Sequence, residues 1–353
     1  MAKKKRSIIK KIILWFFVLL LAAAGITSYI GYRILYMNNV SLSKKKSEII
    51  LIPTGSSFED VMDTLRRKQI LKHERSFLWI AKLKKYPGKV KPGRYRILQN
   101  MSSNEIVNLL RAGWQEPVTI TFNNIRKKEQ LVSIVCKKLE ADSTELLTLL
   151  ENDRYLKDNF GIKIQMLLTL FIPNSYEFKW NTSARQFMER MQIEYKKFWT
   201  IERKQKAKQI SLSQSEVATL ASIVQAEQMQ FPDERPIIAG LYLNRLRIGM
   251  PLQSDPTIIY AINDFTINRV LDKDKEINSP YNTYLHTGLP PGPICLPEIS
   301  SIDAVLNFQK NNYLYMCAKE DFSGRHNFAK ALAEHNQNAR KYRNALNKSR
   351  ILR

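Results

Sequence analysis

The sequence has few of the residues that build metal centres, disulfide frameworks or redox sites. Its 353 residues include only three cysteines and four histidines. Cys136, Cys295 and Cys317 are widely spaced and form no CxxC pair, and an odd number of thiols cannot pair completely within one chain. The histidines show no metal-ligand spacing. We therefore expect no disulfide framework, no metal ion and no organic cofactor, and we expect the cysteines to fill gaps in the core.

Acidic residues are scarce relative to basic ones. Lysine and arginine number 56 against 32 aspartates and glutamates, which leaves a formal net charge of +24. So large a surplus indicates an anionic partner: a nucleic acid, an anionic membrane face or an acidic polymer. Because the chain has neither zinc-finger spacing nor a Gly-rich phosphate loop, the sequence disfavours nucleic acid.

One long segment without charged residues lies near the N-terminus. It covers residues 12–32, and at ~1.5 Å per helical residue it spans about 31 Å, which matches the hydrocarbon core of a bilayer. The basic residues within positions 1–11 predict a cytoplasmic N-terminus, a single-pass anchor in the cytoplasmic membrane and an exported remainder. A cleaved signal peptide is the alternative, because Ala22, Ala23 and Ala24 follow an apolar stretch.

The apolar residues that continue to Leu35 favour the anchor over the signal peptide. Either topology places most of the chain outside the cytoplasm. Nucleic acid is then removed as a partner, and wall polymer or a membrane surface remains.

The rest of the sequence predicts two folded parts of an α+β protein. Residues 33–47, which include a short Lys-rich polar stretch, are expected to form a linker. Residues 48–117 alternate strand and helix patterns, and Ser57 and Asp60 have the spacing of a capping box at the start of a helix. A larger mixed domain is expected over residues 118–353, beginning with a strand.

The segment with the clearest chemical signal is a helix that begins near Ser213. Ser213 and Glu216 have capping-box spacing, which assigns Glu216 a structural role. Apolar residues then follow at spacings of three and four, at Val217, Leu220, Ala221 and Val224. The next position on this apolar stripe is Glu227.

A carboxylate that continues an apolar face must be paired, exposed at the helix end, or functional. Burial against Leu and Val side chains would disfavour the anion and raise the pKa of Glu227, as a general acid near neutral pH requires. The alternative is that Glu227 enters solvent where the helix ends before Pro232. Glu227 is our candidate catalytic residue.

Two other acids in this region are expected to be helix caps. Asp233 precedes Pro236 and Asp255 precedes Pro256, so each would cap a helix with proline in its first turn. Residues 288–293 form a Gly- and Pro-rich run that cannot be a helix or a central strand. Aromatic and amide side chains next to such a stiff loop suit sugar binding, and a covering loop without a ligand is the alternative.

Several stretches carry motifs: LASIVQAE at 220–227, NRL at 244–246, MPLQSDPT at 250–257, YNTY at 281–284, GLPPGPI at 288–294, PNSYEF at 173–178, NFA at 327–329 and EHN at 334–336. Together they resemble the endolytic murein transglycosylases, the MltG or YceG-like family, over nearly the whole exported chain. Residues 49–116 resemble the LysM-like module that precedes the catalytic part in that family. The resemblance implies a transmembrane helix, a LysM-like module at 48–117 and a catalytic domain at 118–353.

The resemblance also implies lytic cleavage of the MurNAc–GlcNAc β-1,4 bond within peptidoglycan strands, leaving 1,6-anhydro-MurNAc ends. Glu227 would protonate the departing glycosidic oxygen and then, as a carboxylate, remove the proton of the sugar's own 6-hydroxyl as it closes on C1. Ordinary glycosidases need a second carboxylate for water or a covalent intermediate. The family analogy adds wall-synthesis proteins as partners.

Two positions depart from the family pattern. The family helix often carries two acidic residues separated by one, and here the first is Gln225, so Glu227 is the only acid there. A catalytic glutamate at the first position would make this protein inactive, but Gln225 falls off the apolar stripe, which favours Glu227. Many relatives have Asp where this chain has Asn174, so Asn174 is assigned no acid–base role.

Candidate residues for lining the sugar cleft are Gln253, Ser254, Tyr281, Asn282 and Tyr284.

Three further residues near these motifs are expected to be structural. They are Arg245, which would pair across helices, and the histidines His326 and His335. Two other functions stay open. One is a non-catalytic wall-binding scaffold, and the other is a hydrolytic muramidase with Asp255 or Asp233 as its second acid.

Overall fold

The computed structural model of the chain describes residues 2–42, 45–123, 125–267 and 269–348, with the backbone alone for residues 2–10. Of the basic side chains predicted to form a cytoplasmic tail, all but that of Lys11 lie outside the described part, as do residues 43–44 of the predicted linker. The chain divides into two compact units, residues 1–118 with 177–182 and residues 119–176 with 183–353. Both mix helices with short antiparallel sheets, so the predicted α+β class is confirmed.

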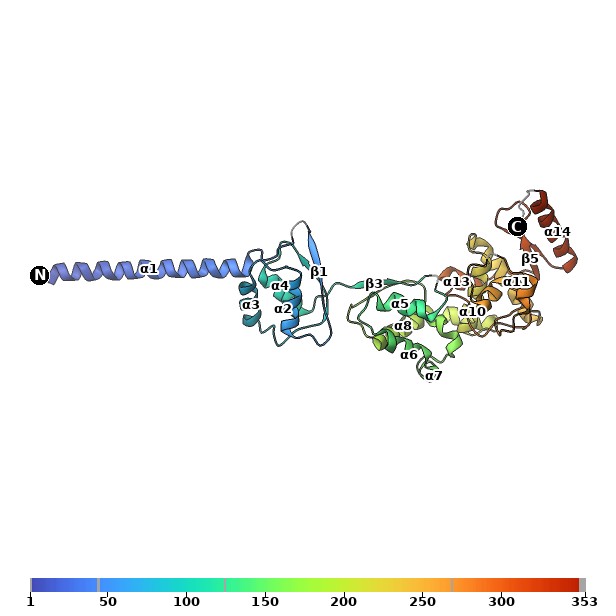
Figure 1. Cartoon of the computed structure of the whole chain (residues 1–353), viewed down its shortest axis with the longest axis horizontal. Helices are drawn as coiled ribbons and strands as arrows, with labels where there is room; N and C mark the ends of the chain where they lie inside the picture. Colours follow the sequence, from blue (N-terminus) through green and yellow to red (C-terminus); the bar gives the residue numbers. More distant parts are fainter. Residues whose placement is uncertain (1, 43–44, 124, 268, 349–353) are drawn as a thin grey trace. The chain divides into compact units, whose positions relative to one another are not determined.

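The first unit begins with one long helix, α1 (Ala2–Tyr36) (Figure 1). Residues 11–36 are long and apolar enough to cross a membrane, and their side chains are almost all exposed. Ile34 and Leu35 pack against the core of the small module that follows, and Asn39 donates its backbone N–H to Met101 at 2.9 Å. The first part of the segment expected as a linker is thus attached to the module.

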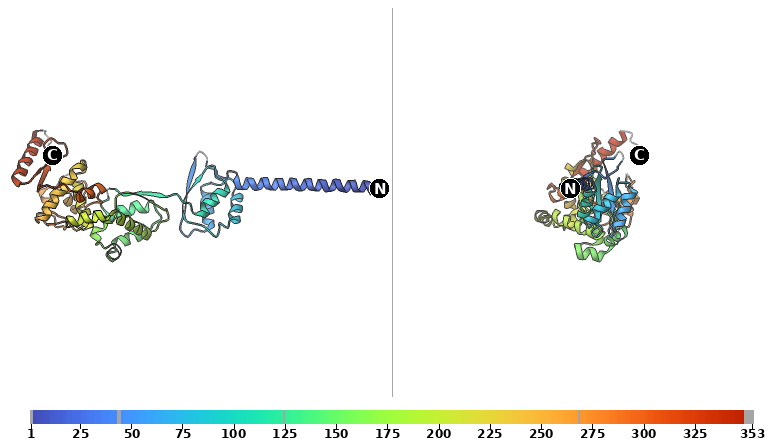
Figure 2. Two further views of the ribbon diagram at one scale, coloured as in Figure 1. Left: turned by 180° about the vertical axis from the view of Figure 1, so that it is seen from behind. Right: turned by 90° about the vertical axis from the view of Figure 1, so that its left-hand side faces the viewer.

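The small module has two strands and three helices. They are β1 (Ser47–Ile52), α2 (Phe58–Arg67), α3 (Glu74–Leu83), β2 (Gly93–Leu98) and α4 (Ser103–Ala112). The strands pair antiparallel with Ile50 opposite Tyr95, and both side chains are fully buried. Ser57 caps α2 with Asp60, as predicted. Helix α3 lies at the edge of this module from which α1 leaves (Figure 1 and Figure 2).

The second unit is mainly helical. The division between the two units falls within strands β3 and β4. The elements from β3 onward are β3 (Val118–Thr121), α5 (Lys128–Cys136), α6 (Ser143–Glu151), α7 (Asp153–Phe160), η1 (Ile164–Leu170), β4 (Ser175–Phe178), α8 (Ala184–Phe198), α9 (Ile201–Gln209), α10 (Gln214–Glu227), η2 (Pro232–Glu234), α11 (Arg235–Arg247), α12 (Asp255–Ile262), η3 (Asp272–Glu276), α13 (Ile299–Leu306), β5 (Tyr315–Ala318), β6 (His326–Ala329) and α14 (Leu332–Lys348). The strands pair as β3 with β4 and β5 with β6.

Helix α10 is the centre of this unit. It packs against α11, α12 and α13, and every residue from Val217 to Gln225 is buried. The helix begins at the predicted capping box, in which Ser213 and Glu216 satisfy each other's backbone N–H groups. It ends at Glu227, because the next residue, Gln228, is extended. A helix that is buried from Val217 to Gln225 therefore presents Glu227 at its last position.

Candidate active site

The carboxyl group of Glu227 is held by two hydroxyl groups. Its Oε1 accepts hydrogen bonds from Tyr242 Oη at 2.8 Å and from Ser254 Oγ. Tyr242 comes from α11, and Ser254 comes from the segment between α11 and α12. In the described part of the chain, no hydrogen bond occupies Oε2. One oxygen is thus anchored, and the other remains available to a ligand.

Glu227 opens into a cleft of about 270 Å³. The cleft is lined by residues from α10, α11, the start of α12, the β5–β6 hairpin and the loops on either side of α12. They are Glu227, Leu241, Tyr242, Arg245, Leu252, Gln253, Asp255, Tyr284, Met316, Cys317, Ala318 and His326. Glu227 is half-buried rather than fully exposed, so it does not simply enter solvent at the end of its helix. A small polar cleft with one protected carboxyl group can accommodate a sugar oxygen beside that group.

The surroundings of Glu227 favour its neutral form. Burial raises the pKa of Glu227, and the hydrogen bonds from Ser254 and Tyr242 only partly oppose this effect. The negative charge of Asp255 raises the pKa of Glu227 further. A carboxyl group with a raised pKa keeps its proton to higher pH and can donate it to a leaving oxygen.

Asp255 is not the helix cap that the sequence predicts. Helix α12 begins at Asp255 itself, Ser254 occupies the cap position without capping through its side chain, and Pro256 is the second helical residue. Asp255 instead lines the cleft and accepts a hydrogen bond from Tyr284 Oη at 2.5 Å. An aspartate before a proline fits either the cap position or the first position of a helix. Here Asp255 takes the first helical position, and its carboxylate lines the cleft.

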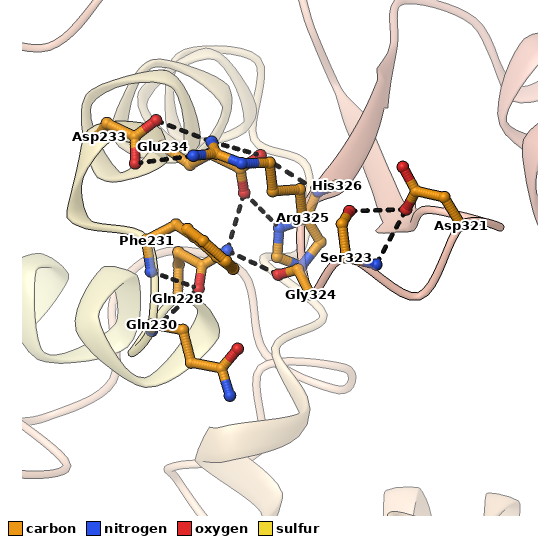
Figure 3. Close-up of polar contacts among 10 residues, drawn as sticks. All are labelled: Gln228, Gln230, Phe231, Asp233, Glu234, Asp321, Ser323, Gly324, Arg325 and His326. Atoms are coloured by element: carbon orange, nitrogen blue, oxygen red, sulfur yellow. Dashed lines mark hydrogen bonds and ion pairs between the residues drawn. The ribbon is translucent and has the colours of Figure 1, made fainter.

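Asp233 is not a cap either. A short 3-10 turn, η2, precedes α11, and Asp233 lies within it. Its carboxylate forms an exposed ion pair with Arg325 at 2.7 Å (Figure 3). Asp233 does not line the cleft.

A polar network includes His326, which is one of the residues that line the cleft (Figure 3). Gln228 donates to Glu234 Oε2 at 2.8 Å and to the carbonyl of Gly324 at 3.1 Å. His326 Nδ1 lies 3.0 Å from the same Glu234 oxygen. The network ties the turn after Glu227 to strand β6 and orients the ring of His326, which lines the cleft. His326 was expected to be structural, and the structure places it at the site.

Gln225 faces away from this cleft. Its Oε1 accepts hydrogen bonds from the Glu298 backbone at 2.6 Å and from Ser301 Oγ at 3.1 Å, at the start of α13. The buried Arg235 side chain meets the same helix start, 2.8 Å from Glu298 and 2.9 Å from Ser301. The residue at the family's first acidic position therefore holds two helices together, and Glu227 is the carboxyl group of α10 that reaches the cleft.

Comparison with known proteins identifies the family. The sequence profile of the YceG-like family matches residues 50–341. This chain belongs to the YceG-like family. An endolytic murein transglycosylase of Bacillus subtilis (strain 168) is 30% identical over 333 residues, which cover 89% of this chain and 91% of that protein.

Two further relatives extend the comparison. An endolytic murein transglycosylase of Streptococcus pneumoniae serotype 2 (strain D39) is 29% identical over 90% of this chain, and the match spans 62% of that longer protein. The crystal structure of a putative YceG-like protein from Listeria monocytogenes is 26% identical, with a TM-score of 0.55, and covers 83% of this chain and 99% of that one.

The structure places the predicted sugar-lining residues of this YceG-like protein in two groups. Gln253 and Tyr284 line the cleft, and Ser254 lies behind it, bonded to Glu227. Tyr281 and Asn282 do not line it. Tyr281 packs against Tyr260 with 4.8 Å between ring centroids.

Asn282 is fully buried and shapes a loop. Its Nδ2 donates to the carbonyls of Lys275 and Ile277 at 2.8 and 2.9 Å, and its Oδ1 accepts from the backbone of Tyr284 at 2.9 Å. All three bonds are to backbone groups of the loop, so the Asn282 amide holds the backbone that leads into Tyr284, which lines the cleft.

Arg245 contributes charge to the cleft and also holds its walls. The guanidinium donates to the carbonyls of Leu252 at 2.7 Å and Leu314 at 2.6 Å, which joins the loop before α12 to the strand β5 region. The expected pairing across helices is wrong, since its partners are loop carbonyls. His335 stacks on Tyr315, outside the cleft, with 5.4 Å between centroids.

The cysteines of the YceG-like protein are all unpaired thiols. Cys295 is buried as expected, whereas Cys317 lines the cleft and does not fill the core. In the part of the chain that the structure describes, no group of three or more His, Cys, Asp or Glu side chains is arranged to hold a metal ion.

Sequence reasoning missed Tyr242, Glu234 and Gln228. Tyr242 lies three residues before Arg245 on α11, so both occupy one face of that helix, and this spacing could have indicated it. Glu234 and Gln228 carry no comparable signal, because their partners lie up to 96 residues away in the chain.

Proposed function

We propose that this protein is an endolytic peptidoglycan lytic transglycosylase, which cleaves the MurNAc–GlcNAc β-1,4 bond within glycan strands and leaves 1,6-anhydro-MurNAc ends. The observation that carries the proposal is the Glu227 carboxyl group, which is half-buried in a polar cleft with a raised pKa and one free oxygen. The names of the curated relatives support the same activity.

In the proposed reaction, neutral Glu227 donates its proton from Oε2 to the glycosidic oxygen as the C1–O bond breaks. The resulting carboxylate then takes the proton of the 6-hydroxyl as that oxygen attacks C1. The proton that leaves Glu227 is thereby restored, and water is not consumed. Tyr242 and Ser254 bind Oε1 throughout and stabilise the transient carboxylate.

Asp255 has an electrostatic role in this proposal. Its negative charge raises the pKa of Glu227 and so helps to keep that acid protonated. Gln253, Tyr284, Arg245 and His326 surround the same cleft and are proposed substrate contacts.

Asp255 is a second carboxylate in the cleft, and it makes a hydrolytic mechanism the alternative to the lytic one. Asp255 could activate water, and the enzyme would then be a muramidase with reducing ends as products. We expect the exported part, incubated with purified glycan strands, to yield anhydro ends, which are lighter than reducing ends by one water molecule in mass spectrometry. Reducing ends would contradict the lytic mechanism, and an absence of new ends would favour a wall-binding scaffold.

Replacing Asp255 by Asn separates the two roles of this residue. Asn can still accept the Tyr284 hydrogen bond but removes the charge that raises the pKa of Glu227. That pKa should fall, so the alkaline limb of the pH profile of kcat/KM should move to lower pH, with a loss of about three- to tenfold above neutrality.

At a pH below this alkaline limb, where Glu227 is protonated in both proteins, the activity of Asp255→Asn should be largely kept. Loss at every pH would instead assign Asp255 a direct catalytic role. The matched control is Asp233→Asn, which removes an exposed carboxylate outside the cleft and should leave the pH profile in place.

The proposal includes a location and an organisation. Helix α1 anchors the protein in the cytoplasmic membrane with its N-terminus inside and both folded units outside, where peptidoglycan is the substrate. Residues 48–117 act as a LysM-like module and residues 118–353 as the catalytic domain. Partnership with wall-synthesis proteins rests on family analogy alone.

A further inference from the structure

A second cavity lies where α1 meets the small module. Its volume is about 460 Å³. Three basic side chains line it, Arg33 from α1 and Lys72 and His73 from the loop before α3. Ile30 and Ile34 provide an apolar wall on the α1 side, and no acidic residue lines the cavity. The cavity thus combines positive charge with an apolar surface.

The positive charge of this cavity is not neutralised by the protein. Within the described residues, neither Arg33 nor Lys72 has a carboxylate at ion-pair distance. The Arg33 side chain donates to Met37 Sδ and lies over the ring of Tyr29. The nearest acid in the sequence, Glu74, is already paired with Arg66 at 2.7 Å. An anion in the cavity would therefore meet an unopposed positive field.

The position of the cavity along α1 determines its level relative to the membrane. Arg33 is the first charged residue after the uncharged run at residues 12–32. Because that run matches the hydrocarbon core in length, Arg33 would lie in the headgroup layer on the exported side, at the level of lipid phosphates. This step rests on α1 crossing the membrane.

The exposed face of α3 has an interfacial composition. Arg75, Trp79 and Leu83 are spaced four residues apart and share one face, on which Trp79 is 50% and Leu83 is 60% exposed. The opposite face, with Phe77 and Ile80, is buried in the module. Helix α3 lies at the edge of the module from which α1 leaves (Figure 1 and Figure 2). An aromatic, an aliphatic and a basic side chain on one exposed face suit the interface between a membrane and water.

We propose that the cavity between α1 and α3 binds the phosphate headgroup of an anionic membrane phospholipid. Arg33, Lys72 and His73 surround the phosphate, and Ile30 and Ile34 contact the upper acyl chain. Trp79 and Leu83 lie on the bilayer surface and hold the small module against the membrane.

The test is lipid binding to the full-length protein in detergent micelles, measured by native mass spectrometry during titration with phosphatidylglycerol or phosphatidylcholine. We expect phosphatidylglycerol to bind about tenfold more tightly than phosphatidylcholine. The double variant Arg33→Gln with Lys72→Gln should lose about tenfold in affinity for phosphatidylglycerol. Millimolar inorganic phosphate should not displace the lipid.

The control variant Lys137→Gln with Lys208→Gln removes the same charge from exposed positions on the second unit, and it should bind phosphatidylglycerol like the unmodified protein. Equal loss in the control, equal binding of the two lipids, or unchanged binding by the Arg33 and Lys72 variant would each overturn the proposal. Displacement by inorganic phosphate would overturn the lipid assignment and identify a site for free phosphate.

Discussion

Glu227→Gln is expected to abolish strand cleavage, with kcat/KM lowered by about a thousandfold or more. Gln keeps the shape of the side chain and can still accept the bonds from Tyr242 and Ser254, but it has no proton to donate or recover. The measurement is the release of anhydro ends from purified glycan strands. Binding of the strands should change little, because the substitution removes only the proton transfer. Retained cleavage would remove Glu227 from the mechanism.

The same variant has a distinct signature in stability. The pKa of Glu227 is raised in the folded state above its ordinary value of 4.5. The favourable contribution of the neutral carboxyl group is therefore complete below pH 4.5 and is lost as the pH rises through the folded pKa. Gln cannot ionise, so Glu227→Gln should match the unmodified protein at pH 4 and exceed its free energy of unfolding at pH 8.

Urea unfolding at these two pH values would measure this difference. A variant that is destabilised at both values would show that the inactive protein is simply misfolded. The matched control is Glu216→Gln at the other end of α10, since Gln serves in a capping box as Glu does. That control should keep its activity and show no gain in stability at pH 8.

Gly240→Ala is expected to destabilise the second unit by about 3 kcal/mol, although alanine normally stabilises the interior of a helix by about 0.5–1 kcal/mol relative to glycine. A methyl group at Gly240 would lie 2.3 Å from the backbone oxygen of Gln309 and 2.5 Å from Asn311 Nδ2. Since a backbone atom must move, α11 and the segment after α13 would separate. The transition temperature should fall by roughly 6–12 °C.

The effect should extend to activity, because Asn311 also ties this segment to Asn244 of α11 at 2.9 Å, just before β5 forms one wall of the cleft. The comparison variant is Gly249→Ala, just after the same helix. Gly249 has a φ of +67° but no neighbour within 4 Å, so only backbone strain of about 1 kcal/mol is expected. Equal losses in the two variants would contradict the close-approach argument, and stabilisation by Gly240→Ala would refute it.

The expected roles of several polar side chains differ from those in the structure for one physical reason. Asp255 and Asp233 fit the sequence pattern of helix caps. The residue at which a helix begins depends on the direction from which the chain enters it, and a shift of one residue is enough to remove the cap. Asn282 has the amide group of a typical sugar contact, but this amide is bonded to three backbone groups of its own loop. A side chain's type limits what it can do, whereas its surroundings decide which of those roles it performs.

Local sequence patterns are enough to predict the features that depend on neighbours three or four residues apart. The length of the uncharged run, the cap at Ser213 and the apolar stripe of α10 were sufficient to place Glu227 at the end of a buried helix face. The groups that surround this carboxyl group come together only when the helices pack. Tyr242 and Ser254, which bond to Glu227, and His326, which lines the cleft, come from 15, 27 and 99 residues away in the chain. These residues are brought together by the packing of α10 against α11 and the hairpin. No local pattern in the sequence predicts which distant segments will pack together.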